Sequence, residues 1–246
     1  MHTLLRKDKN YPPRLNDLFD PPSPLYISGN LGLLKLPMIA IIGSRQASAQ
    51  GLRNAALFAN QLAQAGALII SGLARGIDGA AHRATLSGPD MHFTAAICGT
   101  GLDVVYPKEH CGLAAKISRQ GILISELDLG VGPKPFHFPR RNRIIAALAL
   151  GVVVIEAAEN SGSLITARIA ADLGREVFAL PGPAHDPLYA GCHQLIQQGA
   201  KLVCKPNEVL EELVFHKNRF QTPKNGVFCG LLPKNGGFLD FSRFIG

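Results

Sequence analysis

Residue types that bind phosphate gather in short loops of this 246-residue chain, and the loop Gly43-Ser44-Arg45 comes first. It follows an apolar run and precedes a helix-like stretch. Gly43 permits a tight turn, Ser44 offers a hydroxyl, and the N–H groups of a helix start face outward. Arg45 supplies a planar, two-pronged donor for phosphate. An ordinary strand-to-helix turn with a solvated arginine would contain the same residues. The loop is neither the G-x-G-x-x-G of dinucleotide sites nor a P-loop, which argues against dinucleotide binding and ATP hydrolysis.

Three further loops repeat this arrangement, at residues 71–78, 99–108 and 160–167. Each follows a strand-like run and opens a helix-like one. A lysine at a helix start opposes the helix dipole, so Lys108 indicates contact with a ligand. Loops at the carboxyl ends of parallel strands share one rim of a sheet, where ligands bind. The candidate binding residues of these loops are Arg75, Lys108, Ser161, Gly162, Ser163 and Thr166.

Basic and aromatic side chains alternate in residues 133–143, which lead into an apolar helix-like stretch. Cations follow a phosphate backbone and aromatic rings stack on exposed bases, so the combination is typical of single-stranded nucleic-acid sites. Packing roles for Phe136 and Phe138, beside solvated arginines, explain the segment equally well. Pro139 suits a first helical turn, which places the residues after it at a helix N-terminus. The candidates in this segment are Phe138, Arg141, Asn142 and Arg143.

An acid and a base stand four residues apart at Asp78 and His82, on one side of a predicted helix. The simpler interpretation of Asp78 is a helix-start residue that accepts hydrogen bonds from free N–H groups. We therefore assign no catalytic residue. The five cysteines are odd in number, widely spaced and free of any C-x-x-C pair, which indicates reduced thiols rather than disulfides or a zinc site. We expect no metal and no cofactor.

Composition and charge narrow the class of protein further. The chain is 47% hydrophobic and 17% charged, and its formal net charge of +7 suits a polyanionic partner. The apolar run at residues 144–155 is shorter than the roughly 18 residues that a membrane-spanning helix needs. Residues 1–9 lack the apolar centre of a secretory signal, so we expect a soluble, cytoplasmic protein that does not contact membranes.

Strand-like and helix-like runs alternate along most of the chain. Strands that are apolar on both faces need helices on each side, so we predict an α/β fold: an extended Rossmann-like, doubly wound, mainly parallel sheet of about seven strands. A proline-rich arm is expected at residues 1–37, the binding core at 38–215 and a basic, disordered tail at 216–246. The seven expected strands cover residues 38–42, 68–71, 94–98, 122–125, 152–156, 176–180 and 201–203. The expected helices cover residues 47–65, 78–86, 108–118, 139–149, 163–173, 191–198 and 206–213.

Six sequence blocks between residues 11 and 213 resemble, in order, the DNA processing protein A family (DprA, also called Smf). The blocks are Ile42-Gly43-Ser44-Arg45, Ser71-Gly72-Leu73-Ala74-Arg75-Gly76-Ile77-Asp78, Gly99-Thr100-Gly101-Leu102-Asp103, Arg141-Asn142-Arg143-Ile144-Ile145-Ala146, Ser161-Gly162-Ser163-Leu164-Ile165-Thr166-Ala167 and Gly174-Arg175-Glu176-Val177-Phe178-Ala179-Leu180-Pro181-Gly182. Members of the family protect incoming single-stranded DNA during natural transformation and load the RecA recombinase onto it. Six blocks in the family's order make the resemblance specific.

The resemblance implies a Rossmann-like fold without a nucleotide cofactor, a basic pocket for single-stranded DNA, and a role in DNA uptake, competence and recombination. It implies that Arg45 and Lys108 hold phosphates and that Phe138 contacts a base, with Arg141 and Arg143 nearby. It also implies a homodimer whose surface overlaps the RecA contact. The residues of that surface implied here are His193, Gln197 and Leu202.

The chain departs from the family at its ends and leaves two alternative functions open. Many members carry a helical domain before the arm and a winged-helix-like domain after the core. Here we expect both to be absent, the second replaced by a tail that a shifted reading frame would produce. One alternative is a phosphoribohydrolase-type enzyme of similar fold, although residues 161–168 lack the glutamate that such enzymes carry after the threonine of the comparable loop. The other is a truncated member that no longer acts on RecA.

Overall fold

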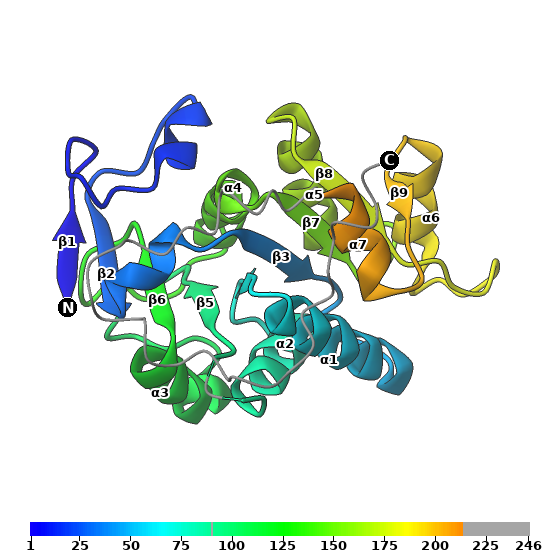
Figure 1. Ribbon diagram of the computed structural model, residues 1–246, viewed down its shortest axis with the longest axis horizontal. Helices are drawn as coiled ribbons and strands as arrows, with labels where there is room; N and C mark the ends of the chain where they lie inside the picture. Colours follow the sequence, from blue (N-terminus) through cyan, green and yellow to red (C-terminus); the bar gives the residue numbers. More distant parts are fainter. Residues whose placement is uncertain (90, 214–246) are drawn as a thin grey trace, which may run out of the picture. The chain divides into compact units, whose positions relative to one another are not determined.

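A mostly parallel sheet forms the centre of the computed structural model, which describes residues 1–89 and 91–213 (Figure 1). The chain divides into two units, Met1–Val214 and Phe215–Gly246, and the expected tail at residues 216–246 lies outside the described residues. Nine strands make up the sheet within the described part of the chain. They are β1 (His2–Leu4), β2 (Leu25–Gly29), β3 (Met38–Ile42), β4 (Leu68–Ser71), β5 (Thr94–Ile97), β6 (Ile122–Ser125), β7 (Gly151–Val154), β8 (Glu176–Ala179) and β9 (Lys201–Leu202).

The strand order is β1-β2-β6-β5-β4-β3-β7-β8-β9, which is a doubly wound arrangement. From β3 the chain adds β4, β5 and β6 in parallel on one side, then returns and adds β7, β8 and β9 in parallel on the other. The order therefore switches between β3 and β7, where the register pairs Ala40 with Val152. Loops that leave two such strands run to opposite sides and open a crevice between them.

Helices cover both faces of the sheet, as the two-sided apolar strands require. They are α1 (Ala49–Gln64), α2 (Ile77–Leu86), α3 (Cys111–Gln120), α4 (His137–Leu148), α5 (Gly162–Asp172), α6 (Ala190–Gln197) and α7 (Pro206–Glu212), with short 3-10 turns η1 (Pro13–Asp17), η2 (Leu31–Lys35) and η3 (Lys108–His110). Each of the seven helices predicted from the sequence is present, with ends that shift by a few residues. The prediction of a doubly wound α/β fold is confirmed.

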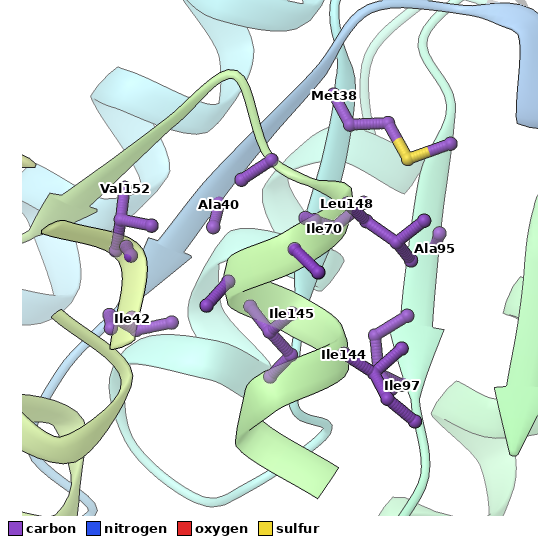
Figure 2. Close-up of a cluster of buried hydrophobic side chains, with 14 of the residues drawn as sticks. Met38, Ala40, Ile42, Ile70, Ala95, Ile97, Ile144, Ile145, Leu148 and Val152 are labelled. Carbon is purple, nitrogen blue, oxygen red and sulfur yellow. The ribbon is translucent and has the colours of Figure 1, made fainter. Parts of the chain in front are cut away.

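Strand β3, beneath α4, contributes buried side chains to both faces of the sheet. Alternate residues of β3, Ala40 and Ile42, face α4, while the buried Ile39 and Ile41 point to the opposite face. Figure 2 shows the α4 side of this core, where aliphatic side chains of the helix lie against those of the strands. Those labelled are Met38, Ala40, Ile42, Ile70, Ala95, Ile97, Ile144, Ile145, Leu148 and Val152.

Residues 1–37 contribute more regular structure than their prolines suggested. They supply β1 and β2, the two strands beyond the seven expected, and β2 pairs antiparallel with β6. Tyr11 and Leu15 of this segment are buried in the same core cluster as α4. Its burial against α4 means that the segment helps to hold the helix that carries residues 137–148.

A buried histidine on α2 makes the fold sensitive to acid. Thr94 donates its hydroxyl proton to the Ile69 carbonyl, so the Nδ1–H of His82 donates to Thr94 Oγ1 over 2.7 Å. The other ring nitrogen, Nε2, is buried without a hydrogen-bond partner. Burial, with smaller contributions from His110, Arg83 and Arg141, lowers the pKa of His82 to about 3. The imidazole is therefore neutral in the folded protein.

We predict that His82→Asn flattens the loss of stability in acid. Below the ordinary histidine pKa of 6.5 the unfolded chain binds a proton that folded His82 does not, so stability falls as the pH drops from there toward about 3. By pH 5 the loss is about 2 kcal/mol. Urea unfolding of both proteins from pH 7 to pH 4 measures the slope. The exposed His185→Asn is the control, and a slope that His82→Asn leaves unchanged would contradict the prediction.

Candidate nucleic-acid interface

A cleft of about 820 Å³ lies at the switch between β3 and β7. The loops that follow β3, β4 and β7 line it, together with the first turns of α4 and α5. Eleven residues predicted from separate sequence blocks line this one cleft, and Lys108 and Arg143 do not. The eleven are Gly43, Ser44, Arg45, Arg75, Phe138, Arg141, Asn142, Ser161, Gly162, Ser163 and Thr166.

The loop after β3 is held in place by backbone hydrogen bonds on two sides. Ser44 N donates to the Glu156 carbonyl over 2.7 Å, and Ile77 N donates to the Ser44 carbonyl over 3.1 Å. Gly76 has a φ of +68°, and a Cβ there would stand 2.1 Å from the Ser44 carbonyl oxygen. Only glycine fits so close an approach. The loops that carry Arg45 and Arg75 are therefore joined by main-chain contacts.

Glu156 anchors the same loop and was not among the predicted site residues. It is fully buried, and its carboxylate accepts hydrogen bonds from Ser48 N over 2.9 Å and from Ser48 Oγ over 2.6 Å. Ser48 in turn caps α1 by accepting from Gly51 N. An acidic residue at the end of the apolar run at residues 151–155 is the sequence signal that could have found it, because buried carboxylates need hydrogen-bonding partners.

Phe138 stands at the centre of an aromatic and cationic cluster in the cleft. The Arg45 guanidinium carbon lies 5.6 Å from the centre of its ring, within the range of a cation–π contact. The Tyr106 ring lies 5.3 Å away with its plane tilted by 43°. A Cβ on Gly99 would stand 2.9 Å from Phe138 Cδ1, so the missing side chain makes room for the ring. Tyr106 lines a smaller hollow beside the cleft and was not predicted.

Arg141 lies buried in the floor of the cleft. Its guanidinium donates to the carbonyls of Gly72 and Ile97, and a Cβ on Gly72 would stand 2.6 Å from Arg141 Nη2. Burial lowers the pKa of Arg141, an effect that the nearby Asp78 carboxylate opposes. Because its donors already bond to backbone carbonyls, Arg141 ties α4 to the loop after β4 and to the last residue of β5.

The Asp78 carboxylate accepts hydrogen bonds from backbone N–H groups, as predicted from its position at a helix start. These N–H groups belong to the loop before α2 and not to the helix itself. Its Oδ2 accepts from Gly72 N over 3.0 Å and from Ala74 N over 3.4 Å. Burial raises the pKa of Asp78, while Arg141 and these two N–H donors act in the opposite direction. Buried His82 bonds to Thr94 instead. Within residues 1–89 and 91–213, Asp78 and His82 therefore form hydrogen bonds with other groups and not with each other.

The remaining basic candidates differ in their freedom to bind. Arg75 is exposed but forms an ion pair with Glu109, and this pairing holds the pKa of Glu109 at about 2. Lys108 is exposed, next to the Pro107 that lines the smaller hollow. Neither Lys108 nor Arg45 has an ion-pair partner within residues 1–89 and 91–213. These two cations are available to an anionic ligand.

The loop after β7 presents hydroxyls at the start of α5. Ser161 caps the helix, with its Oγ 3.4 Å from Ser163 N and 2.7 Å from Ser163 Oγ. Asn142 Nδ2 donates to the Gly162 carbonyl over 3.4 Å, which joins α4 to this loop. The helix start directs N–H groups and hydroxyls into the cleft, an arrangement that suits an anion.

Arg143 lies away from the cleft and serves the N-terminal segment. It forms an ion pair with Glu126 over 2.5 Å and donates to the Asp20 carbonyl over 2.5 Å. The Glu126 side chain is 5% exposed, so this is a largely buried pair. An arginine-rich motif therefore does not place every arginine in the cleft.

The residues implied for a dimer surface lie on and beside α6. His193 Nε2 is 3.1 Å from the Gly182 carbonyl oxygen, so this ring is already engaged within the chain. Gln197 at the end of α6 is exposed, and Leu202 of β9 is 49% exposed. Strand β9 is one edge of the sheet, as far as the described residues go.

No group of three or more metal-binding side chains occurs within residues 1–89 and 91–213. Cys98, Cys111, Cys192 and Cys204 are free thiols, and Cys229 lies outside the described residues. No helix of the described residues has the length and apolar character needed to cross a membrane.

The family model described as DNA recombination-mediator protein A matches residues 2–214. The chain belongs to this family. It is 49% identical over 216 residues to Protein Smf of Escherichia coli (strain K12), a match that covers 87% of this chain and 57% of that protein. Four of the six sequence blocks contribute residues to the cleft, and those at residues 99–103 and 174–182 do not.

Two solved structures are similar along most of the chain. DNA processing protein A from Streptococcus pneumoniae is 46% identical with a TM-score of 0.83, over 87% of this chain and 75% of that one. DNA processing protein A from Helicobacter pylori, described for its single-stranded DNA binding mode, is 30% identical with a TM-score of 0.78, over 86% of this chain and 94% of that one. These relatives agree with the resemblance read from the sequence.

We predict that Arg143→Met lowers the stability of the fold by about 3 kcal/mol, because it leaves the Glu126 carboxylate with only the half-exposed Arg140. Urea unfolding measures the change. The exposed Arg168→Met should stay within about 0.5 kcal/mol of the unchanged protein. Unchanged stability together with weaker binding of single-stranded DNA would instead assign Arg143 to the interface.

Proposed function

We propose that the cleft at the switch between β3 and β7 binds single-stranded DNA. The observation that carries this proposal is the pairing of Phe138 with Arg45 inside the cleft, where a partly exposed ring and a cation without an acidic partner among the described residues lie 5.6 Å apart. An aromatic face accepts a base of any sequence, and the cation accepts the adjoining phosphate. Single strands offer bases that are free to stack, whereas duplex DNA does not.

Residues in the cleft and beside it fit this ligand in four roles. Arg45, Lys108 and Arg75 would contact phosphates, and Phe138 with Tyr106 would contact a base. The hydroxyls of Ser44, Ser161, Ser163 and Thr166 and the amides of Gly43 and Gly162 would donate hydrogen bonds to phosphate oxygens. Arg141 and Asn142 would act by positioning the loops, because their side chains bond to Gly72, Ile97 and Gly162.

Within the cell we propose that the protein processes DNA that enters during natural transformation and passes the bound strand to the RecA recombinase. Its family membership supports this role. We further propose that the protein acts as a homodimer through the exposed edge at β9 and the end of α6. Among the described residues β9 is an edge of the sheet and carries an exposed leucine, and a second copy can add a strand at such an edge.

We infer a binding function rather than an enzymatic one. The buried acid of the cleft is Asp78, and its Oδ2 accepts hydrogen bonds from two N–H groups of the loop before α2. The other acid that lines the cleft, Glu159, is exposed and stands in the loop after β7. A phosphoribohydrolase needs a carboxylate at the sugar, so release of ribose 5-phosphate from nucleoside monophosphates by the purified protein would overturn this inference.

We predict that Arg45→Ala weakens the binding of single-stranded DNA by about 1 to 3 kcal/mol, because a charged hydrogen bond to phosphate is lost. The slope of log affinity against log salt should fall by about 0.7, which corresponds to one phosphate. Fluorescence anisotropy with a labelled oligonucleotide measures both quantities. Arg53→Ala is the matched control, since Arg53 is an exposed arginine of α1 that bonds to Gln50. Equal affinities of the two variants would place the site elsewhere.

We predict the opposite effect for Glu109→Gln. Glu109 competes with phosphate for Arg75, and its carboxylate stays ionised because pairing lowers its pKa to about 2. Removing the charge should strengthen single-strand binding about two- to fivefold and steepen the salt dependence. Glu211→Gln on α7 makes the same change in net charge and should have little effect. Weaker binding by Glu109→Gln would show that the ion pair positions Arg75 for the ligand.

A further inference from the structure

An exposed aromatic ring lies just outside the cleft, at the start of α4. Phe136 is the residue before the first turn of the helix and is 61% exposed. The Lys134 ammonium lies 5.9 Å from the centre of its ring, and the His137 ring meets it edge-on at 4.5 Å. Phe138, two residues further on, is partly buried in the cleft. Residues two apart at a helix start point to different sides. The Phe138 ring therefore lines the cleft, and the Phe136 ring lies on the surface outside it.

A second cation shares the side of α4 on which Phe136 stands. Arg140 is four residues further along, which places it next to Phe136 on the helix surface. Its side chain is 53% exposed and lies 3.2 Å from Glu126. Glu126 also pairs with Arg143, which lies 4.0 Å from the Asp20 carboxylate as well, so Arg140 shares its only acid among the described ion pairs with a second guanidinium. Together with Lys134, the exposed ring has a cation on each side along the chain.

We propose that Lys134, Phe136 and Arg140 form an outer ledge that receives single-stranded DNA as it leaves the cleft. The ring would stack on a base, and the two cations would contact the phosphates on either side of it. This inference rests on the proposed function of the cleft and extends the contact by a separate surface. The ledge adds to binding when the strand is long enough to reach it, so it favours long single strands over short ones.

The charges around Phe136 favour nucleic acid over a protein partner. Hydrophobic contact sites are poor in lysine at their centre, whereas here a lysine ammonium packs on the ring itself. A cation held at an aromatic face, with a further half-exposed arginine beside it, matches a phosphate backbone with an unstacked base. Phe19 offers the comparison, since it is more exposed, at 106%, and none of the described cation–π pairs involves it.

The test measures affinity as a function of strand length. Labelled oligothymidylates of about 5 and about 20 nucleotides span the range of single-strand site sizes. Phe136→Ala should weaken binding of the long strand about tenfold and leave the short strand within twofold. Phe138→Ala should weaken both. Phe19→Ala, which removes an equally large exposed ring, should weaken neither.

The charge contribution has its own readout in the salt dependence with the long strand. Lys134→Ala should reduce the slope of log affinity against log salt by about 0.7. Lys116→Ala, an exposed lysine of α3, should leave the slope unchanged. Circular dichroism of each variant verifies that the fold is retained, which is expected because the substituted side chains are exposed.

Two different failures are distinguishable. If the unchanged protein binds neither oligonucleotide, the proposed function of the cleft is wrong. If it binds both and Phe136→Ala lowers neither affinity, the cleft stands and the outer ledge is overturned, which would leave Phe136 as a surface for protein contact. Equal losses for the short and long strands would also overturn the ledge, because they would place Phe136 within the cleft's own contacts.

Discussion

The switch in strand order between β3 and β7 is the constraint on which the site depends. Both strands are parallel and hydrogen-bonded, yet the chain leaves them toward opposite sides of the sheet. Their following loops cannot pack on each other along their length, so a crevice stays open at their carboxyl ends. Arg45 and Ser161 reach this crevice from regions far apart in the sequence because the sheet brings those strand ends together.

An open crevice is useful only if its walls hold their shape, and buried polar side chains provide that rigidity here. Glu156 holds Ser48 and the start of α1, Asp78 holds the loop after β4, and Arg141 holds the carbonyls of Gly72 and Ile97. Each is a charged group at a strand end or helix start, with partners supplied mainly by the backbone. Because burial makes an unpaired charge costly, these loops are confined to the conformation that satisfies it.

Much of the fold could be predicted because the strands β3 to β8 are short, mostly apolar runs separated by amphipathic helices. Strand β7 contains Val152, Val153 and Val154, which are buried on both faces of the sheet. Consecutive apolar residues predict this two-sided burial from the sequence. The strands β1 and β2 were missed for a physical reason. Residues 25–29 alternate between buried and half-buried positions between prolines, and their pairing with β6 depends on residues about a hundred positions away.

The sequence predicted which loops form the candidate site, but it did not predict what each side chain in those loops contacts. Arg141, Asn142 and Arg143 are neighbours in one motif, yet they face the cleft floor, the loop after β7 and the N-terminal segment. Helical geometry separates consecutive residues by about 100°, so adjacent arginines meet different surroundings. Their partners, Gly72, Gly162 and Asp20, come from distant parts of the chain that only the folded structure brings close.

The balance of acids and bases around the cleft explains why its arginines are not equivalent. Arg141 is enclosed by backbone carbonyls, Arg143 and Arg140 share Glu126, and Arg75 is held by Glu109. Arg45 instead lies over an aromatic ring, which orients a guanidinium without neutralising it. A cation oriented in this way keeps its full charge for a phosphate, and Arg45 has no acidic partner to give up among the described residues. Among the arginines we therefore expect the proposed binding to depend most strongly on Arg45, and the paired arginines to contribute according to how easily their acids release them.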